Sequence, residues 1–97
     1  MYSLVLKNAK IIDGTGKPAY TADIGIVGDK IAAIGSIQQE ENCVDVSGKL
    51  VTPGFIDPHS HADCSLFLYP GCQSYVRQGI TTFVGGQCGD SNAPIRR

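Results

Sequence analysis

Residues 53–61, Pro-Gly-Phe-Ile-Asp-Pro-His-Ser-His, decide the interpretation, because they join a β-type run to two closely spaced histidines. Residues two apart on a strand point to the same face, so His59 and His61 at a strand end would project side by side. They are the 2 histidines of the chain, and their spacing suits two nitrogen ligands on one metal ion. Asp57 and Asp63 flank them and could orient the rings. From spacing alone, an exposed polar loop is the alternative.

A second β-type run, residues 79–84, follows the histidines at a distance that leaves room for a helix. We expect Pro70 in the first turn of that helix, where a missing N–H costs nothing, and Gly79 at its C′ position. Strand, helix and strand within about 30 residues form a βαβ unit, whose strands are parallel and whose crossover is right-handed.

Cys88 follows this second run in a glycine-rich stretch, residues 85–90. Parallel strands open their C-terminal ends on the same side, and neighbours lie about 4.8 Å apart, so Cys88 can approach His59 and His61. A thiolate is a good ligand for zinc. A buried structural cysteine is the alternative, and from the residues alone it is the more common use of a cysteine.

The first half of the chain shows the pattern of short strands and tight turns. Alternating apolar residues predict an antiparallel β layer with one wet and one dry face, and Gly28-Asp29 predicts a two-residue hairpin turn. The expected strands are residues 3–6, 9–12, 22–27, 30–34 and 43–46. We therefore expect a small β-sandwich-type segment over residues 1–52 and a different fold over residues 53–97.

Composition excludes several classes of protein. The 97 residues carry 8 basic and 9 acidic side chains and no basic run, which argues against nucleic-acid binding. No apolar run approaches the roughly 20 residues that span a bilayer, so no membrane partner is expected. Nothing resembles a signal peptide, and none of the 4 cysteines forms a C-x-x-C pair. We expect a cytoplasmic protein with reduced cysteines.

These motifs carry a family resemblance over nearly the whole chain. Residues 53–61 resemble the first barrel strand of the amidohydrolase superfamily, and residues 9–16 resemble its opening β segment. Residues 76–82 and 86–94 are similar to the N-acyl-D-amino-acid deacylase (D-aminoacylase) branch, although Gln87 stands where that branch usually has Asn.

The resemblance implies a hydrolase in which His59, His61 and Cys88 bind Zn²⁺, with Asp57 and Asp63 as weaker candidates for orienting them. The metal would activate water against the amide bond of an N-acyl-D-amino acid. A (β/α)₈ barrel takes about 250 residues, so residues 53–97 would supply only its first βαβ unit. The remaining ligands and the catalytic Asp would come from later strands. We therefore expect this chain to be an N-terminal piece that contains no catalytic residue and is inactive alone.

Two other functions remain open. A hydantoinase or dihydroorotase type of amidohydrolase shares the H-x-H motif, but its second strand does not usually end in this Cys-Gly turn. A non-catalytic β domain that has kept the motif is the other alternative. Unpaired strand edges would favour its association into a homo-oligomer.

Overall fold

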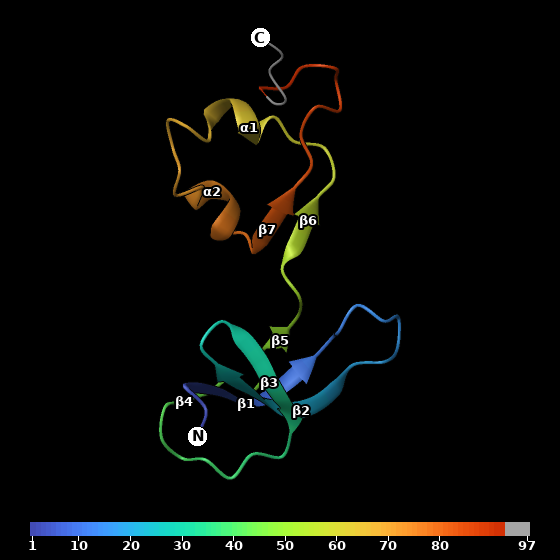
Figure 1. The fold of residues 1–97 in the computed structure, drawn as a ribbon. Coiled ribbons are helices and arrows are strands. Elements are labelled where there is room, and N and C mark those ends of the chain that lie inside the picture. The colour runs from blue at the N-terminus through green and yellow to red at the C-terminus, as the bar shows by residue number, and fades with distance from the viewer. Residues whose placement is uncertain (93–97) are drawn as a thin grey trace. The chain divides into compact units, whose positions relative to one another are not determined.

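The computed structural model describes residues 1–92, and the chain divides into two compact units, Met1–Pro53 and a second unit beginning at Gly54 (Figure 1). The first unit is a five-stranded sheet, and the second pairs two strands beside two short helices. None of the helices in residues 1–92 is long and apolar enough to cross a membrane.

The first unit is built around β1, which pairs on both of its edges. The antiparallel neighbours β2 and β3 form the predicted hairpin, and Gly28 at its turn has φ +60°, as a type II′ turn requires at its first central position. The strands are β1 (Leu4–Ile11), β2 (Tyr20–Val27), β3 (Lys30–Gly35), β4 (Cys43–Asp45) and β5 (Leu50–Val51).

The prediction of two separate strands at residues 3–6 and 9–12 is wrong, because β1 runs through both. Asn8 interrupts the pattern with φ +59°, and the register with β2 shifts between Leu6 and Ala9. One extra residue in one strand is a β-bulge, which bends the strand without ending it. The side chain of Asn8 donates to Oδ1 of Asp45 at 3.1 Å.

The prediction of a purely antiparallel layer is also wrong, because β4 and β5 lie parallel to β1. In the order β3-β2-β1-β4, β3 and β4 lie at opposite ends, so residues 36–42 carry the chain across the sheet before β4 begins. The N–H of Val5 donates to the carbonyl of Asn42 at 2.9 Å, which fixes the start of this pairing. Alternation along a strand reports its faces but not the direction of its partner.

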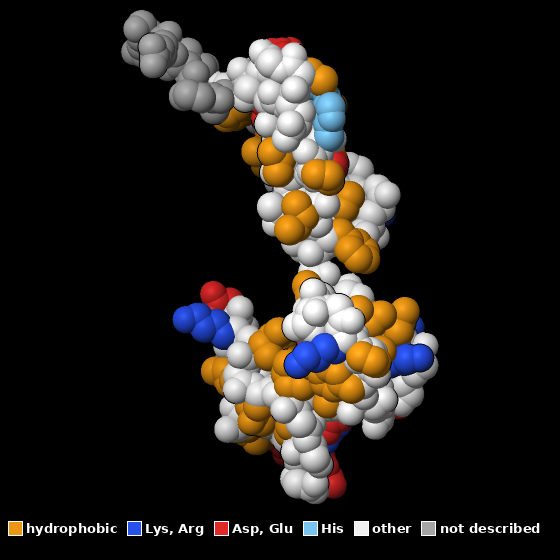
Figure 2. All heavy atoms as spheres, turned by 90° about the vertical axis from the view of Figure 1, so that its right-hand side faces the viewer, with side chains coloured by type: hydrophobic (Ala, Val, Ile, Leu, Met, Phe, Trp, Pro, Cys, Tyr) orange, Lys and Arg blue, Asp and Glu red, His pale blue; other side chains and the backbone are white. Residues whose placement is uncertain are grey.

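The core of the first unit is small, as expected for a sheet of this size. Ala9, Ile11, Ile24 and Val46 form its buried cluster. Other large apolar side chains remain on the surface, and Figure 2 shows hydrophobic atoms reaching the face of this unit. Among them is Ile31 on β3, which is 63% exposed, so the expected division into a wet and a dry face is incomplete.

Asp23 on β2 joins three segments of the first unit. Its Oδ1 accepts from the N–H of Asn8 at 3.0 Å, and its Oδ2 accepts from the N–H of Ile37 at 3.1 Å and from Lys7 at 3.3 Å. These bonds lower the pKa of Asp23, the bond from Asn8 most.

We expect the first unit to lose stability in acid through Asp23. A carboxylate whose folded-state pKa is lowered stabilises the fold fully above its ordinary value of 3.8, and the stabilisation is lost as pH falls through the lower folded-state value. The urea midpoint, measured between pH 7 and pH 3, should therefore drop below about pH 4. Asp23→Asn should lower the midpoint at pH 7 and flatten this drop. Asp29→Asn, in the exposed hairpin turn, should leave the pH profile unchanged; equal profiles for both variants would contradict the assignment.

The second unit has the expected order of strand, helix and parallel strand. Its elements are β6 (Phe55–Asp57), α1 (Ala62–Ser65), α2 (Gln73–Val76) and β7 (Ile80–Phe83), and β6 pairs parallel with β7. The single expected helix is divided into two short ones. Pro70 precedes Cys72, the N-cap of α2, so it lies outside the first helical turn where it was expected. Gly79 was expected at the C′ position, but the C-cap of α2 is Arg77, so Gly79, with φ +80°, lies one residue beyond C′ and ends the following turn.

Candidate metal centre

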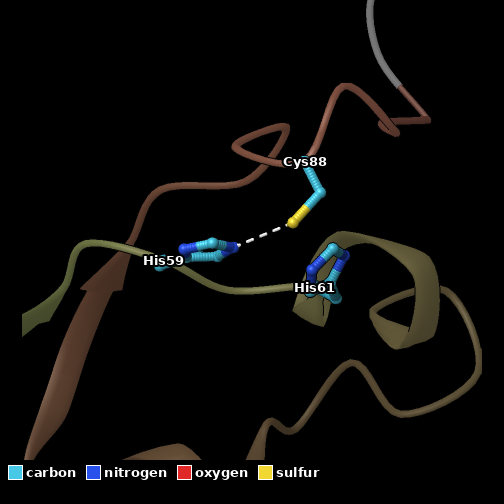
Figure 3. Close-up of side chains that lie close together, drawn as sticks. All are labelled: His59, His61 and Cys88. Atoms are coloured by element: carbon cyan, nitrogen blue, oxygen red, sulfur yellow. Dashed lines mark hydrogen bonds between the residues drawn. The ribbon is translucent and has the colours of Figure 1, made fainter.

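Three side chains meet beyond the C-terminal ends of β6 and β7 (Figure 3). They are His59, His61 and Cys88, and their potential ligand atoms all lie within 4.8 Å of one another. Nε2 of His59 is 3.1 Å from Sγ of Cys88, and the two imidazole centroids are 5.7 Å apart. All three residues are exposed, so the cluster is open to a ligand.

Backbone pairing carries the chain past the end of β6 to the histidines. The N–H of Val84 donates to the carbonyl of Asp57 at 2.9 Å, and the N–H of Ser60 donates to the carbonyl of Val84 at 3.0 Å. Oδ1 of Asp57 accepts from the main-chain N–H of His59 at 3.1 Å. Asp57 therefore holds the backbone that carries the first histidine, and its bond does not go to the imidazole ring.

Ser60, between the two histidines, is 3% exposed. Its Oγ lies 2.6 Å from the hydroxyl oxygen of Tyr75 on α2 and accepts from the N–H of Ala62 at 3.0 Å. Sequence reasoning missed both Ser60 and Tyr75. One signal was available in the sequence. If alternate residues of an extended segment point to opposite sides, then Ser60 points away from His59 and His61 and toward the interior.

We expect Tyr75→Phe to loosen the segment that carries the histidines. The substitution removes one hydrogen bond from a buried hydroxyl, which costs about 1 kcal/mol. Amide exchange at Ser60 and Ala62, measured by hydrogen exchange, should therefore be about fivefold faster. Tyr69→Phe is the matched control, because that side chain is 73% exposed. Equal exchange in the two variants would show that the bond between Tyr75 and Ser60 does not hold this segment.

Cys88 occupies a tight turn built from glycines. The N–H of Gly89 donates to the carbonyl of Gly86 at 3.0 Å, and both glycines have φ +77°. A left-handed φ is open to glycine at little cost, which lets the backbone turn back and present the thiol. Cys88 is exposed, so the alternative of a buried structural cysteine is wrong. Figure 3 shows its sulfur directed toward the histidines.

Asp63 lies in the first turn of α1, and its side chain is hydrogen-bonded to residues 91 and 92 and not to the imidazoles. Oδ2 accepts from Oγ of Ser91 at 3.2 Å and from the N–H of Asn92 at 3.3 Å. The bond from Asn92, more than that from Ser91, lowers the pKa of Asp63. Residues 86–94, the stretch that shows the family resemblance, also include Ala93 and Pro94, which lie outside the described residues.

The other cysteines lie outside the cluster of three. Cys64 is exposed, whereas Cys43 and Cys72 are half-buried. Desolvation, followed by the charges of Asp63 and Asp90, raises the pKa of the Cys64 thiol. A raised pKa disfavours the thiolate, which is the form that binds metals.

The donors of the cluster fit a zinc ion. Tetrahedral zinc, with bonds of about 2.0–2.3 Å, places its nitrogen and sulfur ligands about 3.3–3.6 Å apart. The cluster, with one pair at 3.1 Å and all atoms within 4.8 Å, brackets that spacing. Small side-chain rotations would bring the three ligand atoms to the spacing of a tetrahedral zinc site. Two imidazoles and one thiolate are also ligands that zinc prefers.

Comparison with known proteins gives several strong matches, although no family model matches the chain. A D-aminoacylase of Alcaligenes xylosoxydans xylosoxydans is 44% identical over 96 residues, 97% of this chain and 20% of that protein. A solved D-aminoacylase, studied for its binuclear metal centre, matches with a TM-score of 0.90 and 40% identity, covering 100% of this chain and 21% of its own.

A second solved relative is the N-acyl-D-glutamate deacylase of Bordetella bronchiseptica, complexed with zinc and a phosphonate inhibitor. It matches with a TM-score of 0.88 and 42% identity, covering 99% of this chain and 21% of its own. The chain therefore spans about a fifth of the length of the relatives it matches.

Proposed function

Since this chain belongs to the D-aminoacylase family of amidohydrolases, where it corresponds to the N-terminal part, we propose that the complete protein is a zinc-dependent hydrolase of N-acyl-D-amino acids. The observation that carries the proposal is the convergence of His59, His61 and Cys88 from two separate segments. The metal centres and substrates named for the relatives support it.

In this proposal, His59 and His61 bind zinc through imidazole nitrogens and Cys88 binds through its thiolate. Bound zinc supplies Lewis acidity for the amide carbonyl and lowers the pKa of water. Asp57 and Ser60 hold the backbone on either side of His59, so the segment that carries the imidazoles is held in place by the protein's own bonds. We place the remaining ligands and the catalytic Asp outside these 97 residues.

The same proposal assigns residues 1–52 to a small β domain and residues 53–97 to the first βαβ unit of a (β/α)₈ barrel. The parallel pairing of β6 with β7 supports the second assignment. We also place the protein in a reducing compartment such as the cytoplasm, where cysteine thiols stay unpaired and Cys88 would be free to act as a ligand.

Zinc content and turnover of the complete protein test the proposal. Stoichiometric zinc and hydrolysis of N-acetyl-D-amino acids, in preference to the L enantiomers, are expected, with loss of activity in a chelator and recovery with Zn²⁺. A protein that holds zinc, is inactive on every N-acyl-D-amino acid and opens hydantoins would instead be an amidohydrolase of the hydantoinase type.

The 97-residue chain serves as the second arm of this test. It supplies three of the proposed ligands, so we expect weak zinc binding and no hydrolysis. Tight stoichiometric zinc together with turnover by the 97 residues would overturn the assignment of the catalytic Asp to another part of the protein.

A further inference from the structure

The loop that carries Cys88 begins and ends against one side chain, that of Asp63. At its end, Asn92 donates its main-chain N–H to Oδ2 at 3.3 Å and its side-chain amide to the carbonyl of Asp63 at 3.2 Å. Ser91 adds a bond to the same carboxylate oxygen at 3.2 Å. Three hydrogen bonds from two neighbouring residues therefore converge on Asp63.

The start of the loop is also fitted to Asp63. A Cβ at Gly85 would lie 3.2 Å from Cγ and 3.3 Å from Oδ1 of Asp63, tighter than ordinary van der Waals contact. Oδ1 is buried and has no hydrogen-bond partner within the described part of the chain. The carboxylate thus fills the space between the two ends of the loop, and Cys88 lies in the turn between those ends.

Asp63 is also rigidly connected to the other side of the cluster. It follows His61 by two residues, and His61 is the N-cap of α1. The N–H of Cys64 donates to the carbonyl of His61 at 3.2 Å, which closes the first turn around Asp63. One short segment therefore carries a proposed ligand and the acceptor that holds the loop of another ligand.

We propose that Asp63 is a positioning residue that fixes Cys88 at ligating distance from the two histidines, and that it is not itself a metal ligand. This inference rests on the proposed function, because it assigns Asp63 to the same metal site. Its carboxylate lies outside the cluster of ligand atoms, and its contacts go to the two ends of the loop. The expected role of Asp63 in orienting an imidazole is thereby replaced by a role in holding the thiolate.

Cobalt substitution in the complete protein tests the proposal, because a thiolate bound to Co²⁺ gives a charge-transfer absorption that imidazole ligands do not. Asp63→Ala should weaken this band and lower Co²⁺ affinity by about 10–100-fold, the usual cost of losing a group that orients a ligand. Asp63→Asn keeps one acceptor oxygen and should recover part of both. Asp90→Asn, which removes a charge from the same exposed loop, is the matched control and should resemble the wild type.

Amide exchange over residues 85–92 of the metal-free protein separates this inference from the proposed function. Faster exchange in Asp63→Ala, together with the weakened band, supports the positioning role. A wild-type band that persists in Asp63→Ala overturns it, whatever the exchange rate, and leaves the metal site intact. A wild-type protein that binds Co²⁺ without a thiolate band instead overturns the assignment of Cys88 as a ligand, and the positioning role falls with it.

Discussion

Cys88→Ser in the complete protein is expected to lower zinc affinity by more than the roughly 10–100-fold that loss of an orienting group costs, because it removes a ligand atom. A serine hydroxyl keeps the size of the side chain but stays protonated near neutral pH, and its oxygen is a poorer zinc ligand than a thiolate. At limiting zinc, hydrolysis should fall with affinity. Competition against a chromophoric chelator measures the zinc affinity directly.

Cys64→Ser is the matched control for this experiment. Cys64 is exposed, lies on α1 close in sequence to His61, and stands outside the cluster of ligand atoms. Its raised pKa keeps the thiol protonated, so its replacement should leave zinc affinity at the wild-type value. Wild-type affinity in Cys88→Ser would show that the proximity of Cys88 to the histidines has no role in binding.

The composition of the cluster could be predicted from the sequence, although His59 and Cys88 are 29 residues apart, because its members follow recognisable β-type runs. Two histidines in an H-x-H spacing and a cysteine after the next strand each lie at the end of a β-type run, and parallel strands bring such ends together. The structure brings these three side chains together, while their role as ligands stays a prediction. The bonds of Asp63 to Ser91 and Asn92 span 28 and 29 residues, and no strand pattern in the sequence places these residues beside one another.

In the first unit, a turn set by neighbouring residues was predicted, whereas two features set by distant segments were not. Gly28-Asp29 predicted its hairpin because turn chemistry is read from two neighbouring residues. The parallel pairing of β4 with β1 was missed, because it depends on where residues 36–42 lead the chain. The continuity of β1 was missed because the left-handed φ of Asn8 is stabilised by contacts with Asp23 and Asp45 from other segments.

The pairing of β6 with β7 requires a residue without a side chain at Gly54. A Cβ there would lie 2.7 Å from Cβ of Thr81 and would also overlap its Oγ1 and Cγ2. Threonine is branched at Cβ and has restricted χ1, so Thr81 cannot simply swing aside. The two strands would have to separate. Val84, which follows β7, pairs through its backbone with Asp57 and Ser60, so a separation of the strands would also disturb the segment that carries His59.

Gly54→Ala should therefore destabilise the β6–β7 pair by about 1–3 kcal/mol, the usual cost of overpacking, and lower zinc affinity in the complete protein. Amide exchange across Ile80–Phe83 and at Val84 measures the first effect, and chelator competition measures the second. Gly71→Ala is the matched control, because its nearest contact would be Cγ of Gln73 at an ordinary 3.7 Å. If Gly54→Ala instead exchanges at the wild-type rate and keeps wild-type zinc affinity, the close approach of the strands does not position the histidines.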